Sequence, residues 1–205
     1  RLMNAFAVLS QAAVFWWRNW TTMFTLNLGL ILCWLTVVLG PPATLTAYRI
    51  AANIAQGEEF DPRGVVANIR RYFLPGWGWA LLQLAVAAVI IVNLNFYATL
   101  GGSVGSLLQG VVLGIAILWL LLQLYALPYL VLQEQPQLFR ALRTGLLTLL
   151  ASPVYTLVAA LAVGGIVVVL VRFPYALFFG ALMLIVSYGV FAVLERLDTF
   201  GQRSS

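Results

Sequence analysis

The chain has 205 residues, of which 63% are hydrophobic and only 8% are charged, and its mean hydropathy is +1.00. Soluble domains average about 25% charged residues, so this composition excludes a water-soluble domain and predicts a single membrane domain over residues 1–205. The net charge of +5 comes from scattered arginines beside lipid-length segments, which suits an anionic membrane surface better than nucleic acid, so we expect no nucleic-acid partner.

The first expected element is a short helix over residues 1–18 that lies on or near the membrane interface. Polar residues interrupt its apolar run and no convincing cleavage site follows, so it does not match a signal peptide. It leads into the cluster Trp16, Trp17 and Trp20, and such rings favour the headgroup level. Whether this helix crosses the membrane stays open, as does what precedes Arg1.

Five apolar stretches follow, each near the roughly 20 residues that a transmembrane helix needs. They cover residues 19–39, 77–100, 106–132, 153–171 and 175–194. We expect the Gly40-Pro41-Pro42 run to end the first, because proline interrupts helices. The tight link at 172–174 predicts an antiparallel hairpin of the last two. The expected fold class is all-α, a polytopic bundle of about five transmembrane helices with one interfacial helix and cytoplasmic amphipathic helices.

Two connections between these spans are expected to carry the amphipathic helices. Residues 43–56 have helical character before Gly57, and Asp61-Pro62 begins a second helix with Asp as N-cap and Pro at the first position. Residues 137–150 form a comparable segment. The arginines expected to contact the membrane surface or a partner are Arg63, Arg70, Arg71, Arg140 and Arg143. Each arginine is worth about 1 kcal/mol near anionic lipid, and a cytoplasmic docking partner remains an alternative.

The arginines also set the expected orientation, because cytoplasmic loops are enriched in basic residues. Eight arginines fall in segments 41–76 and 133–152 and in the C-terminal tail, against three on the other side of the five spans. We therefore expect the N-terminus outside and the C-terminus in the cytoplasm.

A small residue recurs at every fourth position at the start of the third span. The members of this small-residue stripe are Gly102, Ser106, Gly110 and Gly114. Such stripes let two helices approach closely. The pattern predicts packing inside the bundle, or an interface with a membrane protein partner or a second copy of the chain. Ala160 and Gly164 are a candidate facing surface.

The polar residues within the spans are amides and hydroxyls. The candidates for an intramembrane polar site are Asn27, Asn93, Asn95 and Gln123. Neighbouring helices commonly satisfy such amides, so structural hydrogen bonds and a ligand or permeation role are both open.

Catalysis and metal binding find no support in the residue types. The chain has no histidine, which excludes a Ser–His pair and a histidine metal ligand, and the single Cys33 excludes an intrachain disulfide. Intramembrane aspartyl catalysis needs paired buried carboxylates, yet the six acidic residues lie at the edges of spans or in loops. We expect no enzyme, no catalytic residue, no metal and no cofactor.

Several short segments are similar to those of a known family: Asn27-Leu28, Trp34-Leu35, Gly40 to Thr44 with Tyr48-Arg49, Gly57-Glu58, Arg70 to Phe73, Leu124 to Pro128, and Ala141 to Arg143. Together they resemble the YesL-like family of bacterial membrane proteins of unknown function. It implies a protein of the bacterial inner (plasma) membrane. Because members of that family often accompany genes for sugar uptake and polysaccharide breakdown, it also implies a place beside a carbohydrate transporter or sensor.

The leading expectation is a non-enzymatic scaffold or accessory subunit of a larger membrane protein complex. The first alternative is a small transporter or channel-like protein for a neutral solute, lined by the four amides. A membrane-assembly factor that uses the cytoplasmic arginine helices is a further alternative.

Overall fold

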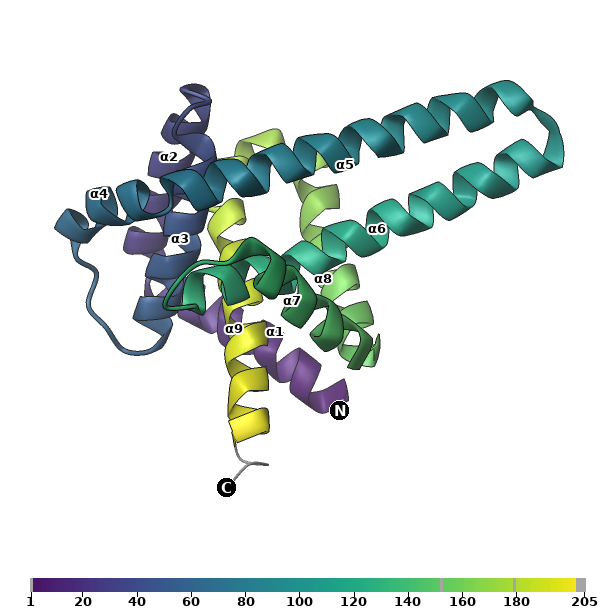
Figure 1. Cartoon of the computed structure of the whole chain (residues 1–205). Helices are drawn as coiled ribbons and strands as arrows, with labels where there is room; N and C mark the ends of the chain where they lie inside the picture. Colours follow the sequence, from purple (N-terminus) through teal and green to yellow (C-terminus); the bar gives the residue numbers. More distant parts are fainter. Residues whose placement is uncertain (1, 152, 179, 202–205) are drawn as a thin grey trace.

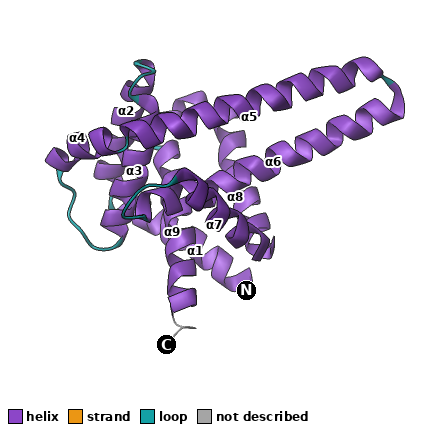
Figure 2. Cartoon of the chain, in the orientation of Figure 1, coloured by secondary structure: helices purple, strands orange, loops and turns teal. Residues whose placement is uncertain are grey.

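The computed structural model describes residues 2–151, 153–178 and 180–201, which form helices and no strand (Figure 2). The elements are α1 Leu2–Arg18, α2 Trp20–Leu35, α3 Gly40–Ala55, α4 Pro62–Arg71, α5 Phe73–Leu100, α6 Gly102–Leu132, α7 Leu138–Ala151, α8 Pro153–Arg172, the 3-10 turn η1 Pro174–Leu177 and α9 Ala181–Gly201. The all-α prediction is confirmed.

The most prominent feature is a long antiparallel hairpin, α5 and α6, that leaves a body made of the other helices (Figure 1). The base of the hairpin packs on α3, α7 and α9, and its tip lies far from the body. At the tip, Gly101 and Gly102 have φ of 61° and 64°, a left-handed backbone that glycine adopts without steric cost.

Two helices are long and apolar enough to cross a membrane, and they are the two arms of this hairpin. A bent pair made of α7 and residues 156–166 of α8 counts as a third candidate if the pair is taken as one span. The prediction of a helical protein with membrane-spanning helices is therefore supported by two to three candidate spans, and the predicted number of five spans is not confirmed. Figure 1 also shows the hairpin running across α9 rather than alongside it.

Helix α3 lies at the centre of the body, in contact with α2, α4, α5, α6 and α9. Ala43, Ala47 and Ala51 recur at every fourth position and are all buried, so neighbouring helices approach α3 closely. The helix itself was expected, but the sequence suggested a surface connection. Its small side chains let the neighbouring helices pack closely around α3. Because alanine is only weakly hydrophobic, the sequence of α3 did not show beforehand that this helix would be buried.

Two expected helix boundaries are wrong. Helix α2 ends at Leu35 rather than at residue 39, and the Gly40-Pro41-Pro42 run begins α3, with proline at the positions where a helix needs no N–H. Helix α9 begins at Ala181 rather than at 175, because Gly180 has φ of 101° and interrupts the helix.

The first and last helices of the described residues meet in the body, where α1 packs on α9. Phe15 and Phe191 make an edge-to-face ring contact with centroids 5.1 Å apart. Trp16 Nε1 donates to Gly180 O at 3.2 Å. The expected N-terminal helix is therefore present, and one of its faces belongs to the core, with Val8 and Ala12 buried.

Candidate functional site

The base of the hairpin is closed by two reciprocal hydrogen bonds between tryptophan and glutamine. Trp79 Nε1 of α5 donates to Gln123 Oε1 of α6 at 3.1 Å, and Trp119 Nε1 of α6 donates to Gln83 Oε1 of α5 at 2.7 Å. We call these four residues the Trp–Gln staple. Each arm contributes a tryptophan and, four positions later, a glutamine, so the antiparallel arrangement pairs them twice. This pairing was not predicted, although the repeated spacing of Trp and Gln is visible in the sequence.

The tip of the hairpin is closed by different contacts. Gln109 Nε2 donates to Leu94 O at 3.1 Å across the two arms. A Cβ added at Gly105 would lie 2.7 Å from Tyr97 O, so only glycine fits there. The two arms are thus fixed to each other at both ends by polar and backbone contacts.

The outer faces of the hairpin touch nothing in the described residues. None of the most apolar 18-residue window of α5 is buried, and a third of the corresponding window of α6 is. In water, so large an apolar surface would be strongly unfavourable. It must be covered by lipid or by another protein.

The small-residue stripe belongs to this uncovered surface. Ser106 is exposed, and a Cβ added at Gly102, Gly110 or Gly114 would meet nothing within 4 Å. Gly164 in α8 is also open. The stripe therefore does not pack against another helix in the described residues. The alternative expectation, an interface with another molecule, remains a prediction.

Close helix approaches occur instead at three glycines that follow no common spacing. A Cβ at Gly76 would lie 2.8 Å from Pro42 N, one at Gly145 would lie 3.1 Å from Ala126 N, and one at Gly189 would lie 3.0 Å from Leu124 O. These glycines hold α5, α7 and α9 against α3 and α6. No local pattern in the sequence could have identified them.

The structure does not bring together the four amides that the sequence predicted to lie within the membrane. Asn27 is fully buried in the body, where its Nδ2 donates to Leu177 O at 2.8 Å. Asn93 and Asn95 donate to Val89 O and Ile91 O of their own helix. Gln123 belongs to the Trp–Gln staple, and its Nε2 also donates to Trp119 O at 3.3 Å. Each amide has a structural hydrogen bond, and the four do not line a shared cavity.

The C-terminal end of α6 is held by three side chains from α3, α4 and the α4–α5 junction. Arg49 Nη1 and Tyr72 Oη donate to Val131 O at 3.1 and 3.2 Å, and Arg71 Nη2 donates to Glu134 O at 2.6 Å. Cations at a helix C-terminus interact favourably with the helix dipole. Burial raises the pKa of Tyr72, and the nearby Arg49 and Arg71 lower it in part.

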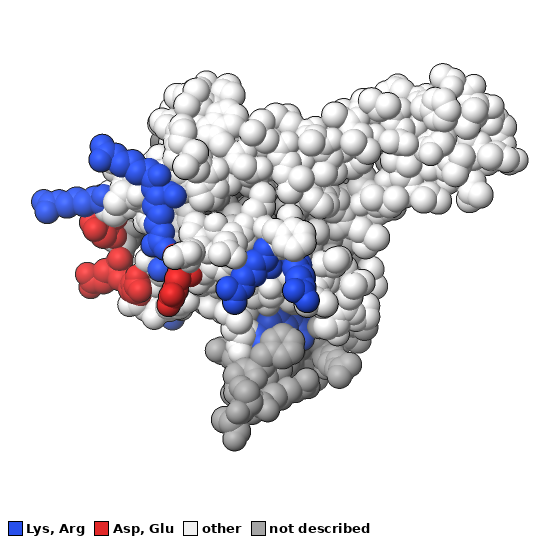
Figure 3. Space-filling model, viewed as in Figure 1, with Lys and Arg blue, Asp and Glu red and all other residues white. Residues whose placement is uncertain are grey.

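The other predicted surface arginines are exposed. Arg63, Arg70, Arg140 and Arg143 all lie on the surface of the body. Figure 3 shows the charged side chains of this face gathered on the body, whereas α5 and α6 contain no charged residue. Asp61 caps α4 as expected, with its Oδ1 accepting from Arg63 N at 2.9 Å.

Two surface grooves accompany this region of the body. A polar groove of about 540 Å³ lies beside the α6–α7 connection and includes Gln133, Glu134 and Arg140. An apolar groove of about 220 Å³ lies between α2, α3 and α4. The polar groove opens widely to the surface, and it gathers no set of converging buried polar groups that would define a ligand site.

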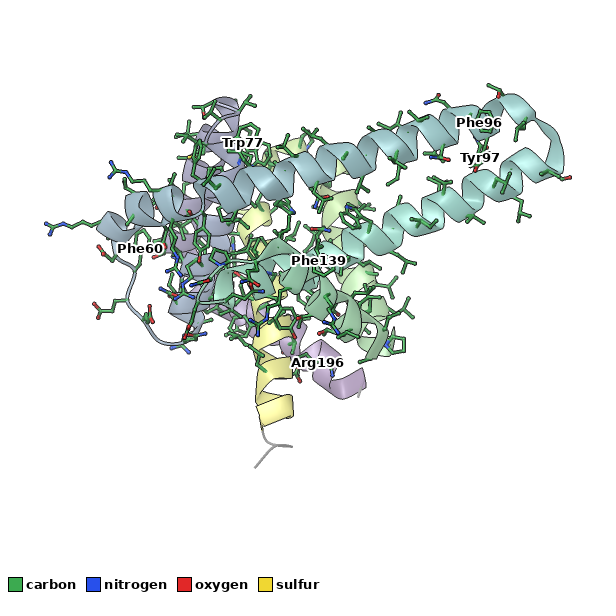
Figure 4. The ribbon with its side chains drawn as sticks, viewed as in Figure 1. Phe60, Trp77, Phe96, Tyr97, Phe139 and Arg196 are labelled. Atoms are coloured by element: carbon green, nitrogen blue, oxygen red, sulfur yellow. The ribbon has the colours of Figure 1, made fainter. Side chains whose placement is uncertain are left out.

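Aromatic residues mark two levels along the hairpin (Figure 4). Trp77 lies where α5 leaves the body, and Phe96 and Tyr97 lie near the tip. The rise along a helix from Trp77 to Tyr97 is about 30 Å, which equals the hydrocarbon thickness of a typical bilayer, roughly 30 Å. Aromatic rings at that separation are typical of the two interfaces of a membrane.

The described residues contain no group of three or more His, Cys, Asp or Glu side chains that could hold a metal ion. The comparisons with protein-family models, curated proteins and solved structures gave no match to this chain. The resemblance to the YesL-like family therefore stays a prediction, and the candidate site is defined by the chain's own geometry: an apolar hairpin with uncovered faces on a body that carries the charge.

Proposed function

We propose that the protein is a non-enzymatic scaffold or accessory subunit, embedded in a bilayer through the α5–α6 hairpin and bound there to other membrane proteins. The observation that carries the proposal is the hairpin itself, whose outer faces find no cover in the described chain. Most of its outer surface is apolar, and its arms contain no charged residue, which leaves shape and apolar contact as the main means of recognition.

The small-residue stripe is the face of α6 that we assign to a partner helix. Lipid chains gain nothing from a smooth helix surface, but a neighbouring helix can approach it closely and gain dispersion energy. Gly110 and Gly114 are open to such an approach, since no atom of the described chain outside α6 lies within 4 Å of an added Cβ.

The expected location is the bacterial inner membrane, with the body on the cytoplasmic side. Because α1 and α9 both belong to the body, this proposal places the N-terminal helix in the cytoplasm as well, and it replaces the N-terminus outside that the count of five spans predicted. The support for this location is the asymmetry of charge, because the exposed arginines lie on the body and the tip has none. The resemblance to the YesL-like family suggests a carbohydrate transporter or sensor as the partner. The transport alternative has less support, because the four amides are separate and each has a structural hydrogen bond.

Affinity purification from native membranes in a mild detergent, read by mass spectrometry, tests the proposal. A membrane protein should be recovered in stoichiometric amount with the wild type and lost with the double variant Gly110→Leu, Gly114→Leu. The matched control is Ala87→Leu, Ala88→Leu, which enlarges exposed positions of α5 and should leave recovery unchanged. Recovery of the wild type as a solitary monomer would refute the scaffold function.

A further inference from the structure

One face of α7 carries arginines near its beginning and leucines near its end. We call it the α7 outer face, and its members are Phe139, Arg140, Arg143, Leu146, Leu147 and Leu150. All six side chains are exposed, Phe139 and Leu150 by 82% and 65%. The opposite face, with Ala141, Gly145 and Thr148, is buried. The polarity of the outer face therefore changes along the helix, from charged at one end to apolar at the other.

The α7 outer face lies close to the level at which α5 leaves the body. The Trp–Gln staple pairs Trp79 with Gln123, so in the antiparallel hairpin Trp77 lies near the level of Ala126. A Cβ at Gly145 would lie 3.1 Å from Ala126 N, which places the middle of α7 near that level too. Helix α7 packs on α6 and runs from its end back in the direction of the hairpin tip (Figure 1). The arginines of the outer face thus lie near the expected membrane interface, and its leucines extend toward the hydrocarbon.

The two arginines of this face are placed to share one phosphate group. Arg143 follows Arg140 by three positions, so the two side chains are neighbours on the helix surface. Like charges that are neighbours on a helix repel each other, and α7 contains no acidic residue that would offset the repulsion. An anion between the two guanidinium groups makes the same arrangement favourable, and the planar guanidinium matches the oxygens of a phosphate. The pair therefore indicates a phosphate-bearing ligand.

The polar groove beside the α6–α7 connection offers a place for the rest of a lipid headgroup. Arg140 belongs to both the groove and the α7 outer face, so a phosphate held by the arginine pair lies at the edge of the groove. The groove is also lined by the amides of Gln133 and Gln137 and by the carboxylate of Glu134, all of which accept hydrogen bonds from hydroxyl groups. It is too open to enclose a soluble ligand. A headgroup needs no enclosure, because the acyl chains already hold the lipid in the bilayer.

The three leucines of the outer face fit an acyl chain in position and length. They begin one turn after Arg143 and end at Leu150. The rise from Arg143 to Leu150 is about 10 Å, which stays within the roughly 15 Å that one leaflet contributes to the hydrocarbon core. A molecule with phosphate at one end and hydrocarbon at the other therefore matches the whole outer face, whereas a soluble phosphate would leave the leucines uncovered.

We propose that the α7 outer face binds an anionic phospholipid of the cytoplasmic leaflet. Its phosphate lies between Arg140 and Arg143, its headgroup enters the polar groove, and one acyl chain lies along the leucines. Two cations for one phosphate leave an excess of positive charge, which favours an anionic lipid over a zwitterionic one. This inference rests on the membrane location proposed above, but it requires no protein partner.

Native mass spectrometry of the purified protein in a mild detergent tests the site independently of membrane orientation. The wild type should bind phosphatidylglycerol more tightly than phosphatidylcholine or phosphatidylethanolamine, and glycerol phosphate should not displace it. The double variant Arg140→Gln, Arg143→Gln should weaken the tightest phosphatidylglycerol site about 25-fold, at about fivefold for each arginine. Equal binding of the three lipids by the wild type would overturn the proposal. Displacement by glycerol phosphate would also overturn it, because the ligand would then be a soluble phosphate.

The matched control is Arg63→Gln, Arg70→Gln, which removes the same charge from α4. Those arginines are seven positions apart, about two helical turns, and do not form a pair, so the tightest site should keep its affinity. A loss as large as that of the α7 variant would show that net charge alone decides binding, and would overturn the site. Leu150→Gln keeps both arginines and should also weaken phosphatidylglycerol binding, and an unchanged affinity would overturn the position of the acyl chain.

A labelling experiment separates failure of this site from failure of the proposed membrane crossing. In a Cys33→Ala background, which has no other cysteine, Val92→Cys on an exposed face of α5 should be protected from a membrane-impermeant maleimide in reconstituted vesicles. Ser103→Cys, at the tip, should react in the molecules whose tip faces the reagent. Reaction of Val92→Cys from water would refute the crossing of α5–α6, whatever the lipid assay shows. Protection of Val92→Cys with equal binding of the three lipids would overturn the lipid site alone.

Discussion

At the scale of single residues, close packing is decided by a few backbone contacts rather than by the repeated small residues. Gly76 and Gly78 lie two positions apart in α5, yet a Cβ at Gly76 would meet the backbone of Pro41 and Pro42, and one at Gly78 would meet nothing within 4 Å. The same residue type therefore has opposite consequences at neighbouring positions.

This contrast gives the first prediction. Gly76→Ala should lower the free energy of unfolding by about 1–3 kcal/mol, because backbone must move to admit the methyl group. Gly78→Ala is the matched control and should be neutral or slightly stabilising, since alanine has the higher helix propensity. Thermal unfolding of the two variants in detergent measures the difference, and equal unfolding temperatures would contradict the close approach of α5 to α3.

Tyr72 provides a prediction with a defined pH dependence. Tyr72→Phe removes the hydrogen bond to Val131 O and should cost about 0.5–1.5 kcal/mol near neutral pH. Burial raises the pKa of Tyr72 in the folded protein. The contribution of the neutral phenol to the free energy of unfolding is therefore fully present below about pH 10, the pKa of tyrosine in the unfolded chain. It is lost as the pH rises through the folded value.

The measurement is denaturant unfolding of the wild type and Tyr72→Phe between pH 6 and pH about 11, a range set by the tyrosine pKa. The stability difference should be constant up to about pH 9 and should shrink above pH 10. A difference that grows at alkaline pH would show that the phenol ionises more easily in the folded state.

Local rules predicted some residue roles and could not reach others. Asp61 was expected to cap α4 because an N-cap needs only its own next turn, and its side chain does so. Gly76 and Gly189 could not be identified, since their importance depends on helices distant in the sequence. The Trp–Gln staple could be predicted only in part. The spacing of Trp and Gln on each helix is visible in the sequence, but the antiparallel register that brings each Trp to the Gln of the other helix is not.

At the scale of elements, helices were predictable wherever length and hydrophobicity alone decided them. Helices α5 and α6 are long, apolar and uninterrupted, so both were recognised within a few residues of their ends. The end of α2 and the beginning of α9 depend on turns at residues 36–39 and at Gly180, which tertiary contacts fix. The burial of α3 was missed because its alanines and threonines do not form a strong apolar face.

The Trp–Gln staple supplies the prediction at this scale. Gln123→Leu removes the bond from Trp79 and the bond to Trp119 O and should destabilise the hairpin by about 0.6–1.7 kcal/mol, the range found for hydrogen bonds between membrane helices. Asn95→Leu is the control, because Asn95 bonds only to its own helix. A double-mutant cycle with Trp79→Phe should give a coupling energy above zero, and strict additivity would show that the two side chains do not interact.

At the scale of the whole molecule, charge and hydrophobicity are segregated between the body and the hairpin. The composition predicted a membrane protein, and the sequence showed that most arginines lie in the connections at residues 41–76 and 133–152 and in the C-terminal tail. It could not give the number of crossings, because apolar segments of about 16 to 20 residues occur both as membrane spans and as buried core helices. In the part of the chain that the structure describes, α5 and α6 are long and apolar enough to cross a membrane, with the bent pair of α7 and α8 as a third candidate span.

Orientation is the prediction that belongs to this scale. If the arginines keep the body in the cytoplasm, the tip of the wild type should lie outside, and the triple variant Arg63→Gln, Arg70→Gln, Arg71→Gln with Ser103→Lys should give a mixed orientation. Labelling of Val104→Cys in intact cells by an impermeant thiol reagent measures the fraction with the tip outside. Identical labelling with and without the charge changes would show that packing, not charge, sets the orientation.

The pairing of α1 with α9 has a consequence for biosynthesis. Helix α1 is synthesised long before α9, so Phe15 lacks its ring contact with Phe191 while the helices between them are being translated. The arms α5 and α6 are neighbours in sequence and can pair as soon as both have left the translocon. The contact of α1 with α9 therefore forms late in biosynthesis, and a nascent chain that ends before residue 181 keeps Phe15 and Trp16 without their long-range partners Phe191 and Gly180.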